Sequence, residues 1–251
     1  SEYRVDGNQR WKYNRANIYG RQIVDGIFLS VKYDIGRNYP SWGLKHIAEY
    51  EGLVKEGRQF YDASKIKQNW NDPVEREKIV AYGIDDSDDS HNLYYLQAPS
   101  YFYMCQSIPK SFQQVVWSAS GSWLNLIMVR AYLQKNHSIP KASEDEYVGG
   151  GMSWGNPGIY DNVSKWDAKS YYPSTIIAFD LYDKQKDPNA YYLKMVKHFT
   201  AKRFEQKNLH KETDDPYYDD LQAASKIFIN SCYGLMATKG LNFNNYKIAQ
   251  E

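Results

Sequence analysis

The stretch from Trp123 to Lys135 carries the clearest hydrophobic pattern of the chain. Its apolar residues recur every three or four positions, the spacing that places side chains on one face of a helix. They are Trp123, Leu124, Ile127, Met128, Tyr132 and Leu133. The pattern predicts an amphipathic helix that ends before Pro140, because residues preceding a proline disfavour the helical conformation.

Three shorter patterns precede this helix. Ile23 to Val31 is typical of a buried strand or of the start of a helix, and Trp42 to Tyr50 predicts a helix after a turn at Pro40. Glu75 to Ala81 predicts a helix that leads into a cluster of acidic residues. The cluster comprises Asp85, Asp86, Asp88 and Asp89. The change in character near residue 140 indicates a domain boundary there.

The C-terminal part predicts a loop, a strand and a helical hairpin. Glycines from Gly149 to Gly158 indicate the loop, and Val163 to Asp167 predicts the strand that follows. Ala190 to Asn208 predicts a basic helix, and Leu221 to Tyr233 predicts a second one after a turn at Pro216. The acidic residues between them would form the tip of the hairpin.

Composition restricts the class of protein. With 251 residues, 42% of them hydrophobic and 24% charged, the chain is expected to be globular. The longest apolar stretch, Trp123 to Val129, is far shorter than the roughly 20 residues of a membrane span, so no membrane partner is expected. Two cysteines and an N-terminus without a signal-like apolar run favour a reducing intracellular setting.

The net charge of +1 conceals a local excess of positive charge. Between Lys184 and Lys211 there are eight basic residues against two acidic ones, and Glu212 to Asp220 then carries five acids and no base. A solvated helix followed by a polar loop explains this distribution as well as a binding surface does.

Asp167 is the first candidate for chemistry. A carboxylate at the end of a rigid strand can hold a divalent metal ion beside a phosphate under attack. The turn that follows, Ala168 to Tyr171, would expose backbone amides to phosphate oxygens. A turn former or helix cap is the competing interpretation of the same aspartate.

A second candidate surface lies on the last predicted helix. Lys226, Asn230 and Tyr233 are spaced to share one face, and Gly234 either lets that face be approached closely or ends the helix. Together they offer a cation, an amide and a ring. Arg203 and Lys207 form a similar pair on the basic helix, although a solvated face remains the alternative for each position.

These segments resemble the motifs of the family B DNA polymerases. Motif A, Asp-x-x-Ser-Leu-Tyr-Pro-Ser, is matched from Asp167 to Ser174 with Tyr171 in place of leucine. Motif B, Lys-x-x-x-Asn-Ser-x-Tyr-Gly, is matched in full from Lys226 to Gly234. Tyr147 to Gly150 resembles the Tyr-x-Gly-Gly segment of the family, and the three motifs occur in the family's order.

The resemblance implies a mixed α+β fold made of parts of three domains. Residues 1–140 would be the C-terminal part of an RNase H-like 3'-5' exonuclease domain. Residues 141–189 would be the N-terminal part of the palm, residues 190–234 the fingers, and residues 235–251 the return to the palm. The chain then resembles the middle of a replicative polymerase of the phage or viral kind.

The resemblance also implies roles for single residues. Asp167, with Ala168 beside it, would bind two Mg²⁺ ions, for which Mn²⁺ can substitute, and Tyr172 would be the steric gate against a ribose 2'-hydroxyl. The residues implied to contact the nucleotide are Ser170, Tyr171, Tyr172, Arg203, Lys207, Lys226, Asn230 and Tyr233. Those implied to contact DNA are Tyr147, Gly149, Gly150 and Gly234.

The N-terminal part resembles the exonuclease domain more weakly. Tyr82 to Asp86 matches its Tyr-x-x-x-Asp motif, which implies a metal ligand at Asp86 and a water-orienting ring at Tyr82. Residues 1–81 contain neither the Asp-x-Glu motif nor the Asn-x-x-x-Phe-Asp motif, so proofreading is in doubt. An acidic helix end, or a nuclease site made by the four aspartates with carboxylates from residues 1–81, is the alternative.

The implied activity is DNA-directed DNA synthesis from dNTPs on a primer and template. No Tyr-x-Asp-Thr-Asp segment of the motif C kind follows motif B. We therefore expect a companion chain that carries motif C and the first exonuclease motifs, or a longer protein, and no synthesis by these residues alone. A DNA-binding or assembly module without catalysis is the rival, and a phage-encoded enzyme would work in the host cytoplasm.

Overall fold

The computed structural model describes residues 2–6, 9–34, 36–144 and 153–250. The chain divides into two compact units. The first comprises residues 1–102 and 111–117, and the second comprises residues 103–110 and 118–251. Within the described residues, no helix is both long and apolar enough to cross a bilayer.

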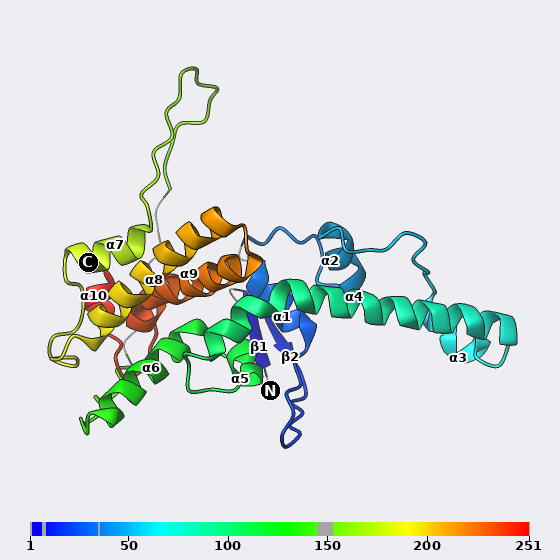
Figure 1. Ribbon diagram of the computed structural model, residues 1–251, viewed down its shortest axis with the longest axis horizontal. Helices are drawn as coiled ribbons and strands as arrows, with labels where there is room; N and C mark the ends of the chain where they lie inside the picture. The colour runs from blue at the N-terminus through cyan, green and yellow to red at the C-terminus, as the bar shows by residue number, and fades with distance from the viewer. Residues whose placement is uncertain (1, 7–8, 35, 145–152, 251) are drawn as a thin grey trace. The chain divides into compact units, whose positions relative to one another are not determined.

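The first unit begins with a small antiparallel sheet and continues with helices (Figure 1). Strands β1 (Glu2–Asp6) and β2 (Gln9–Lys12) pair with Glu2 opposite Lys12. The following helices are α1 (Gly26–Tyr33), α2 (Leu44–Tyr50), the short 3₁₀ turn η1 (Ala63–Lys65), α3 (Ile66–Asn69), α4 (Pro73–Cys105) and α5 (Phe112–Trp117).

The second unit is built from helices. They are α6 (Ser120–Gln134), α7 (Tyr171–Ala178), α8 (Tyr191–Thr213), α9 (Pro216–Ala237) and α10 (Tyr246–Gln250). Helices α6, α8 and α9 enclose its core, in which Trp123, Val196 and Ile229 are each at most 1% exposed. Helices α6 and α9 contact each other, and each contributes apolar residues at helical spacing to this core.

Several sequence predictions are confirmed. The stripe beginning at Trp123 forms α6, and the segment after Pro40 forms α2. Of the two alternatives for Ile23 to Val31, the helix is found, and Asp25 caps it by accepting a hydrogen bond from the Ile27 amide at 3.1 Å. The predicted helix at Glu75 is only the first part of α4.

The predicted strand from Val163 to Asp167 is wrong. This segment is an irregular loop in which Val163 is 72% exposed and Trp166 is 92% exposed. Residues 153–169 make no backbone hydrogen bond to any other described backbone group. A strand needs a neighbouring strand to satisfy its backbone, and none lies beside this segment in the described part of the chain.

The mixed α+β fold with an RNase H-like part is not confirmed either. In the ranges that the structure describes, β1 and β2 are the only paired strands. The described residues of the expected exonuclease part, 1–140, form mainly helices, of which α4 is the longest at 33 residues.

Candidate functional site

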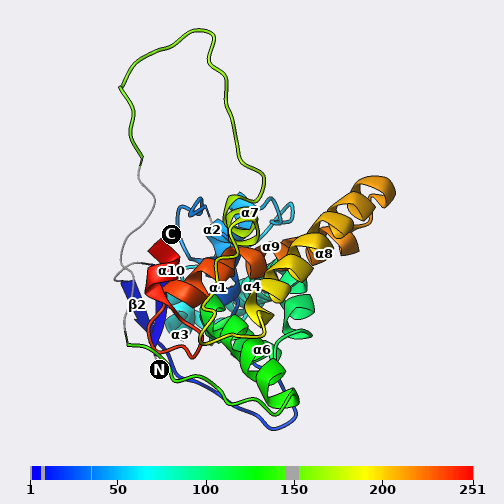
Figure 2. The ribbon, with the colours of Figure 1, turned by 90° about the vertical axis from the view of Figure 1, so that its left-hand side faces the viewer.

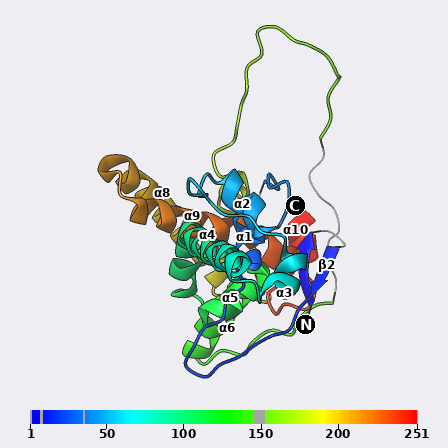
Figure 3. The same cartoon turned by 90° about the vertical axis from the view of Figure 1, so that its right-hand side faces the viewer.

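Helices α8 and α9 form the hairpin predicted from the sequence. They lie side by side in all three views (Figure 1, Figure 2 and Figure 3). The rings of Phe199 and Phe228 stack with their centroids 4.5 Å apart, and Ser225 Oγ donates to Gln206 Oε1 at 2.9 Å. Both contacts are between the two helices, so they fix the register of the hairpin.

The tip of the hairpin is tighter than expected. Helix α8 continues to Thr213 and α9 begins at Pro216, so only Asp214 and Asp215 form the turn. Asp214 has a left-handed backbone with φ of 54°, and Asp215 caps α9 by accepting from the Tyr217 amide at 2.9 Å. Most of the acidic run therefore lies within the helix ends.

Buried polar contacts fix the start of α8. Asp187, which is 2% exposed, accepts hydrogen bonds from the backbone amides of Tyr191 and Tyr192 at 3.0 and 2.8 Å. Its carboxylate also accepts from the Tyr132 hydroxyl at 2.6 Å. Burial, and then this bond to a carboxylate, raise the pKa of Tyr132, so the hydroxyl stays a donor. The hairpin is thereby anchored to α6.

The turn before α7 and the first turn of α7 contact the two helices of the hairpin. Arg203 of α8 donates from Nη1 to Ser170 Oγ at 2.9 Å, and the Lys169 ammonium lies 4.1 Å from the ring centroid of Phe204. On α9, the ring of Tyr233 lies 5.3 Å from that of Tyr172. Residues 169 and 170 of motif A are thus brought to α8, and Tyr172 is brought to Tyr233 of motif B.

The backbone of this turn has an uncommon conformation. Ser170 has φ of 52° and ψ of 54°, in the left-handed region that costs a residue with a Cβ roughly 1 kcal/mol or more. The chain reverses there, and α7 begins at Tyr171 with Pro173 in its first turn, where a proline is tolerated. The contact from Arg203 to Ser170 supports this conformation.

Four cations of this turn and of the hairpin have no acidic partner among the described residues. Within the described residues, none of them forms an ion pair with a carboxylate. They are Lys169, Arg203, Lys207 and Lys226. Arg203 is half-buried, its Nε is buried with no hydrogen-bond partner among the described residues, and burial lowers its pKa. A surface with unpaired cations attracts anions such as phosphates.

The predicted face of α9 is present. Lys226 and Asn230 are exposed, and Tyr233 is half-buried against Tyr172. Gly234 does not end the helix, because α9 continues to Ala237. A Cβ added at Gly234 would meet no atom within 4 Å, which leaves this position open to a bound molecule.

A long loop leads into α7 (Figure 2). Asp167 and Ala168 belong to this loop and are exposed. In the described part of the chain, no group of three or more His, Cys, Asp or Glu side chains is arranged to hold a metal ion. Asp167 is therefore not part of such a group among residues 2–6, 9–34, 36–144 and 153–250. Tyr147, Gly149 and Gly150 lie outside the described residues.

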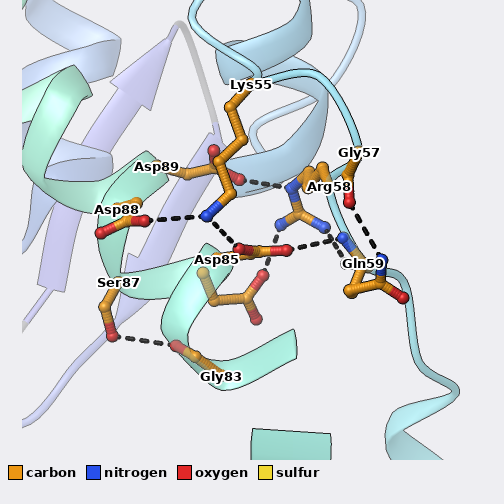
Figure 4. A network of polar contacts seen from close by, with 10 residues as sticks. Lys55, Gly57, Arg58, Gln59, Gly83, Asp85, Ser87, Asp88 and Asp89 are labelled. Carbon is orange, nitrogen blue, oxygen red and sulfur yellow. Dashed lines mark hydrogen bonds and ion pairs between the residues drawn. The ribbon is translucent and has the colours of Figure 1, made fainter. Parts of the chain in front are cut away.

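The acidic cluster of the first unit is paired with basic side chains (Figure 4). Arg58, whose side chain is 2% exposed, bridges two aspartates of α4. Its Nη2 lies 2.5 Å from Asp86, and its Nε lies 2.7 Å from the buried carboxylate of Asp89. The guanidinium therefore sits where the predicted metal ligand Asp86 would need an ion.

The other two aspartates bind Lys55. Its ammonium lies 2.5 Å from Asp85 and 3.1 Å from Asp88, and the backbone amide of Gln59 donates to Asp85 at 2.6 Å (Figure 4). The Gln59 amide and then Lys55 hold the pKa of Asp85 below its ordinary value. Hydrogen bonds to Asp85 and Asp88 raise the pKa of Lys55. These contacts fasten the loop before η1 onto α4.

Tyr82 also has a partner in the first unit. The ammonium of Lys45 lies 4.3 Å from its ring centroid. The roles of Tyr82 and Asp86 in an exonuclease stay predictions, and so does a nuclease site made by the four aspartates. The contacts favour the interpretation of this cluster as a structural feature of α4.

Sequence reasoning missed Lys169 and Phe204 in one unit and Lys55 and Arg58 in the other. Lys169 contacts Phe204, Lys55 contacts Asp85, and Arg58 contacts Asp86. The residues of each contact are about 30 positions or more apart in sequence, so no local spacing relates them. The signal that was available for Lys169 is its place two residues after Asp167 within motif A.

Comparisons with known proteins give relatives in archaea. No protein-family model matches the chain. It is 24% identical over 226 residues to DNA polymerase 2 of Aeropyrum pernix, covering 77% of this chain and 28% of that protein. A DNA polymerase of Pyrococcus glycovorans is 23% identical over 268 residues, covering 91% and 34%.

Among solved structures, the chain is similar to the family B DNA polymerase from the hyperthermophilic archaeon Pyrobaculum calidifontis. The TM-score is 0.70 at 19% identity, over 93% of this chain and 35% of that one. The chain thus spans about a third or less of the length of the proteins that it matches. At this identity the structural likeness shows the fold.

Proposed function

Since this chain is a homologue of archaeal DNA polymerases and has the fold of a family B DNA polymerase, we propose that it binds the incoming nucleotide and the DNA in template-directed synthesis. The reaction would transfer a nucleotidyl group from a dNTP to a primer 3'-hydroxyl. One observation carries the proposal: the turn after Asp167 contacts a hairpin that presents cations without acidic partners.

The hairpin cations would bind the triphosphate. Arg203 presents a planar set of donors that suits phosphate oxygens, and Lys207 and Lys226 act as point charges. Because these groups are positioned before the reaction, they would stabilise the charge that spreads over the phosphates in the transition state. The exposure of Lys207 and Lys226 supports this role, since neither charge is used in the described fold.

Two rings and an amide would select the sugar and base. Tyr172 is 48% exposed and packs against Tyr233, so its ring has a support behind it and an open side for a deoxyribose. A 2'-hydroxyl would clash with that ring. Asn230 and Tyr233 would line the pocket for the new base pair, and the backbone at Ser170 and Tyr171 would contact the triphosphate.

Asp167, with the carbonyl of Ala168, would be one ligand of the divalent metal, Mg²⁺ or Mn²⁺. Two bound ions supply charge neutralisation and alignment of the attacking and leaving oxygens in such reactions. Because the described residues contain no cluster of metal-binding side chains, we propose that the remaining carboxylates come from another segment or a companion chain. These residues alone are then expected to be inactive in synthesis.

The domain limits of the sequence analysis become part of the proposal. Residues 190–234 would be the fingers, which fits the hairpin of α8 and α9. Residues 141–189 and 235–251 would belong to the palm, and residues 1–140 to the end of the exonuclease domain. A phage or viral type, and work in a host cytoplasm, rest on the sequence motifs alone.

Reconstitution of synthesis tests the proposal. The purified chain with primer, template, dNTPs and Mg²⁺ should extend no primer, whereas addition of the segment or chain that carries motif C should restore extension. In that complex, Asp167→Asn should abolish synthesis. The matched control is Asp161→Asn in the same exposed loop, which should keep it.

A non-catalytic DNA-binding or assembly module is the second candidate. The isolated position of Asp167 among the described residues favours it. Under this alternative, Asp167→Asn leaves synthesis by the complex unchanged, and primer-template binding by the chain is the only activity lost when the hairpin is altered. Extension by the chain alone would contradict both candidates.

A further inference from the structure

Lys169 and Arg203 both take part in the contact between α8 and the turn before α7. Arg203 donates a hydrogen bond to Ser170. Phe204, the next residue on α8, contacts the ammonium of Lys169, the residue before Ser170. The two contacts are therefore consecutive in both segments. Each contact places one cation, Arg203 or Lys169, between α8 and the motif A turn.

We propose that Lys169 is a further ligand of the triphosphate and that Phe204 positions it. The inference rests on the proposed function, because it concerns the same nucleotide site. It adds a residue of the turn itself to the cations that the hairpin supplies.

The chemistry of the contact leaves the charge of Lys169 available. An ammonium over the face of an aromatic ring is attracted by the ring but keeps its full charge and its remaining N–H donors. Lys55, in contrast, forms ion pairs with Asp85 and Asp88. Among the described residues Lys169 has no carboxylate within ion-pair distance.

The position of the ring explains why this lysine differs from other exposed lysines. A free lysine side chain samples many rotamers, and ordering it on a ligand opposes binding. The ring of Phe204 already restricts the Lys169 ammonium to the part of α8 at Phe204, the residue that follows Arg203 in sequence. Loss of the ring should therefore weaken phosphate binding although no charge is lost.

The test is a titration of the 251-residue chain with inorganic tripolyphosphate and with a dNTP at two salt concentrations. Lys169→Met removes the charge and should raise Kd about tenfold, the loss of one charged hydrogen bond. Its binding should also depend less on salt. Phe204→Leu should raise Kd about threefold with the salt dependence of the wild type, and Lys169→Arg should bind like the wild type because arginine also stacks on rings.

Lys194→Met is the matched control. Lys194 also lies on α8, over the ring of Tyr191 at 5.3 Å, and donates to the Asn189 carbonyl at 2.9 Å. This variant removes one positive charge from α8, the helix that Lys169 contacts, and should leave Kd unchanged. Circular dichroism on each variant shows whether the helices are retained.

The outcomes separate this inference from the proposed function. If Lys169→Met binds like the wild type while Lys226→Met binds weakly, the inference is overturned and the nucleotide site stands. If Lys169→Met and Lys194→Met weaken binding equally, a general charge effect replaces the inference. If the wild-type chain binds neither tripolyphosphate nor dNTP, the proposed function fails and the inference fails with it.

Discussion

The two units of this protein each contain a cluster of charged side chains, and the clusters are built in opposite ways. In the first unit, Lys55 and Arg58 are surrounded by four aspartates of α4. In the second, the motif A turn and the hairpin present cations that have no acidic partner among the described residues. These cations are Lys169, Arg203, Lys207 and Lys226.

The difference separates charges that hold the fold from charges that are available to a ligand. A cluster in which each aspartate contacts a cation stabilises the contact between a loop and a helix, and none of its cations is left for a phosphate. A cluster of cations without acidic partners contributes little to stability and attracts anions. Substitutions in the two clusters should therefore affect different measurements.

The largest effect is expected for Arg58→Ala. This change leaves the buried carboxylate of Asp89, and Asp86 beside it, without a counterion, which costs about 3–5 kcal/mol of unfolding free energy. Urea unfolding of the chain followed by circular dichroism measures it. Lys65→Ala is the control, since Lys65 and Asp62 are 3.9 Å apart and both largely exposed, and it should cost about 1 kcal/mol or less. Equal losses in the two variants would contradict a structural role for the buried pair.

Lys226→Ala should affect nucleotide affinity and leave stability nearly unchanged, the reverse of Arg58→Ala. Its side chain is exposed and has no ion pair within the described residues, so the free energy of unfolding should change by no more than about 0.5 kcal/mol. The dNTP affinity should fall by about tenfold or more, which corresponds to a charged hydrogen bond of roughly 1.5–3 kcal/mol. Titration calorimetry and urea unfolding on the same sample check both values. A loss of stability with unchanged affinity would place Lys226 among the structural charges.

Two glycines extend the comparison to backbone positions. Gly234→Ala should stabilise the chain by about 0.5–1 kcal/mol, because Gly234 lies inside α9 and an added Cβ meets nothing. The same change should weaken primer-template binding if this open surface contacts DNA. Gly121→Ala in α6 is the matched control: its Cβ would lie 3.3 Å from the Gly234 carbonyl oxygen, so it should bring less stabilisation or none and leave DNA binding unchanged. Thermal unfolding and fluorescence anisotropy with labelled DNA are the measurements, and unchanged DNA binding in Gly234→Ala would remove this residue from the interface.

The smallest effect is a pH dependence that arises from Asp85. Its pKa is lowered in the folded protein, so its contribution to stability is complete above the ordinary value of 3.8 and is lost as the pH falls through the folded value. The stability difference between the wild type and Asp85→Asn should therefore be largest near neutral pH and shrink in acid. Urea unfolding at a series of pH values checks this. A difference that stays constant with pH would mean that the carboxylate charge of Asp85 is not what matters.

The helices that could be predicted are those whose stabilising contacts follow local periodicity. Helix α6 was evident from the stripe that begins at Trp123, and the α8–α9 hairpin from a basic segment and a second helical segment on either side of a turn at Pro216. The strand at Val163 could not be judged from its own residues, because a strand is stabilised by a neighbour that local sequence does not specify. Among the described residues no segment supplies that neighbour, since β1 and β2 form the one sheet there and residues 163–167 make no backbone hydrogen bond.

The site was predictable to the same extent. The face that contains Lys226, Asn230 and Tyr233 follows from helical spacing, and the structure confirms that these residues share α9. The contacts of Lys169 with Phe204, and of Arg58 with Asp89, join residues 35 and 31 positions apart in sequence. Pattern alone could not distinguish a lysine that binds a ring from one that binds two aspartates.

Lysine footprinting with an amine-reactive reagent, with and without dNTP, tests the central claim most directly. The account predicts that dNTP protects Lys169, Lys207 and Lys226 from modification, while Lys194 stays reactive and Lys55, held by two aspartates, reacts slowly in both conditions. Unchanged reactivity of the first three lysines, or equal protection of Lys194, would contradict it.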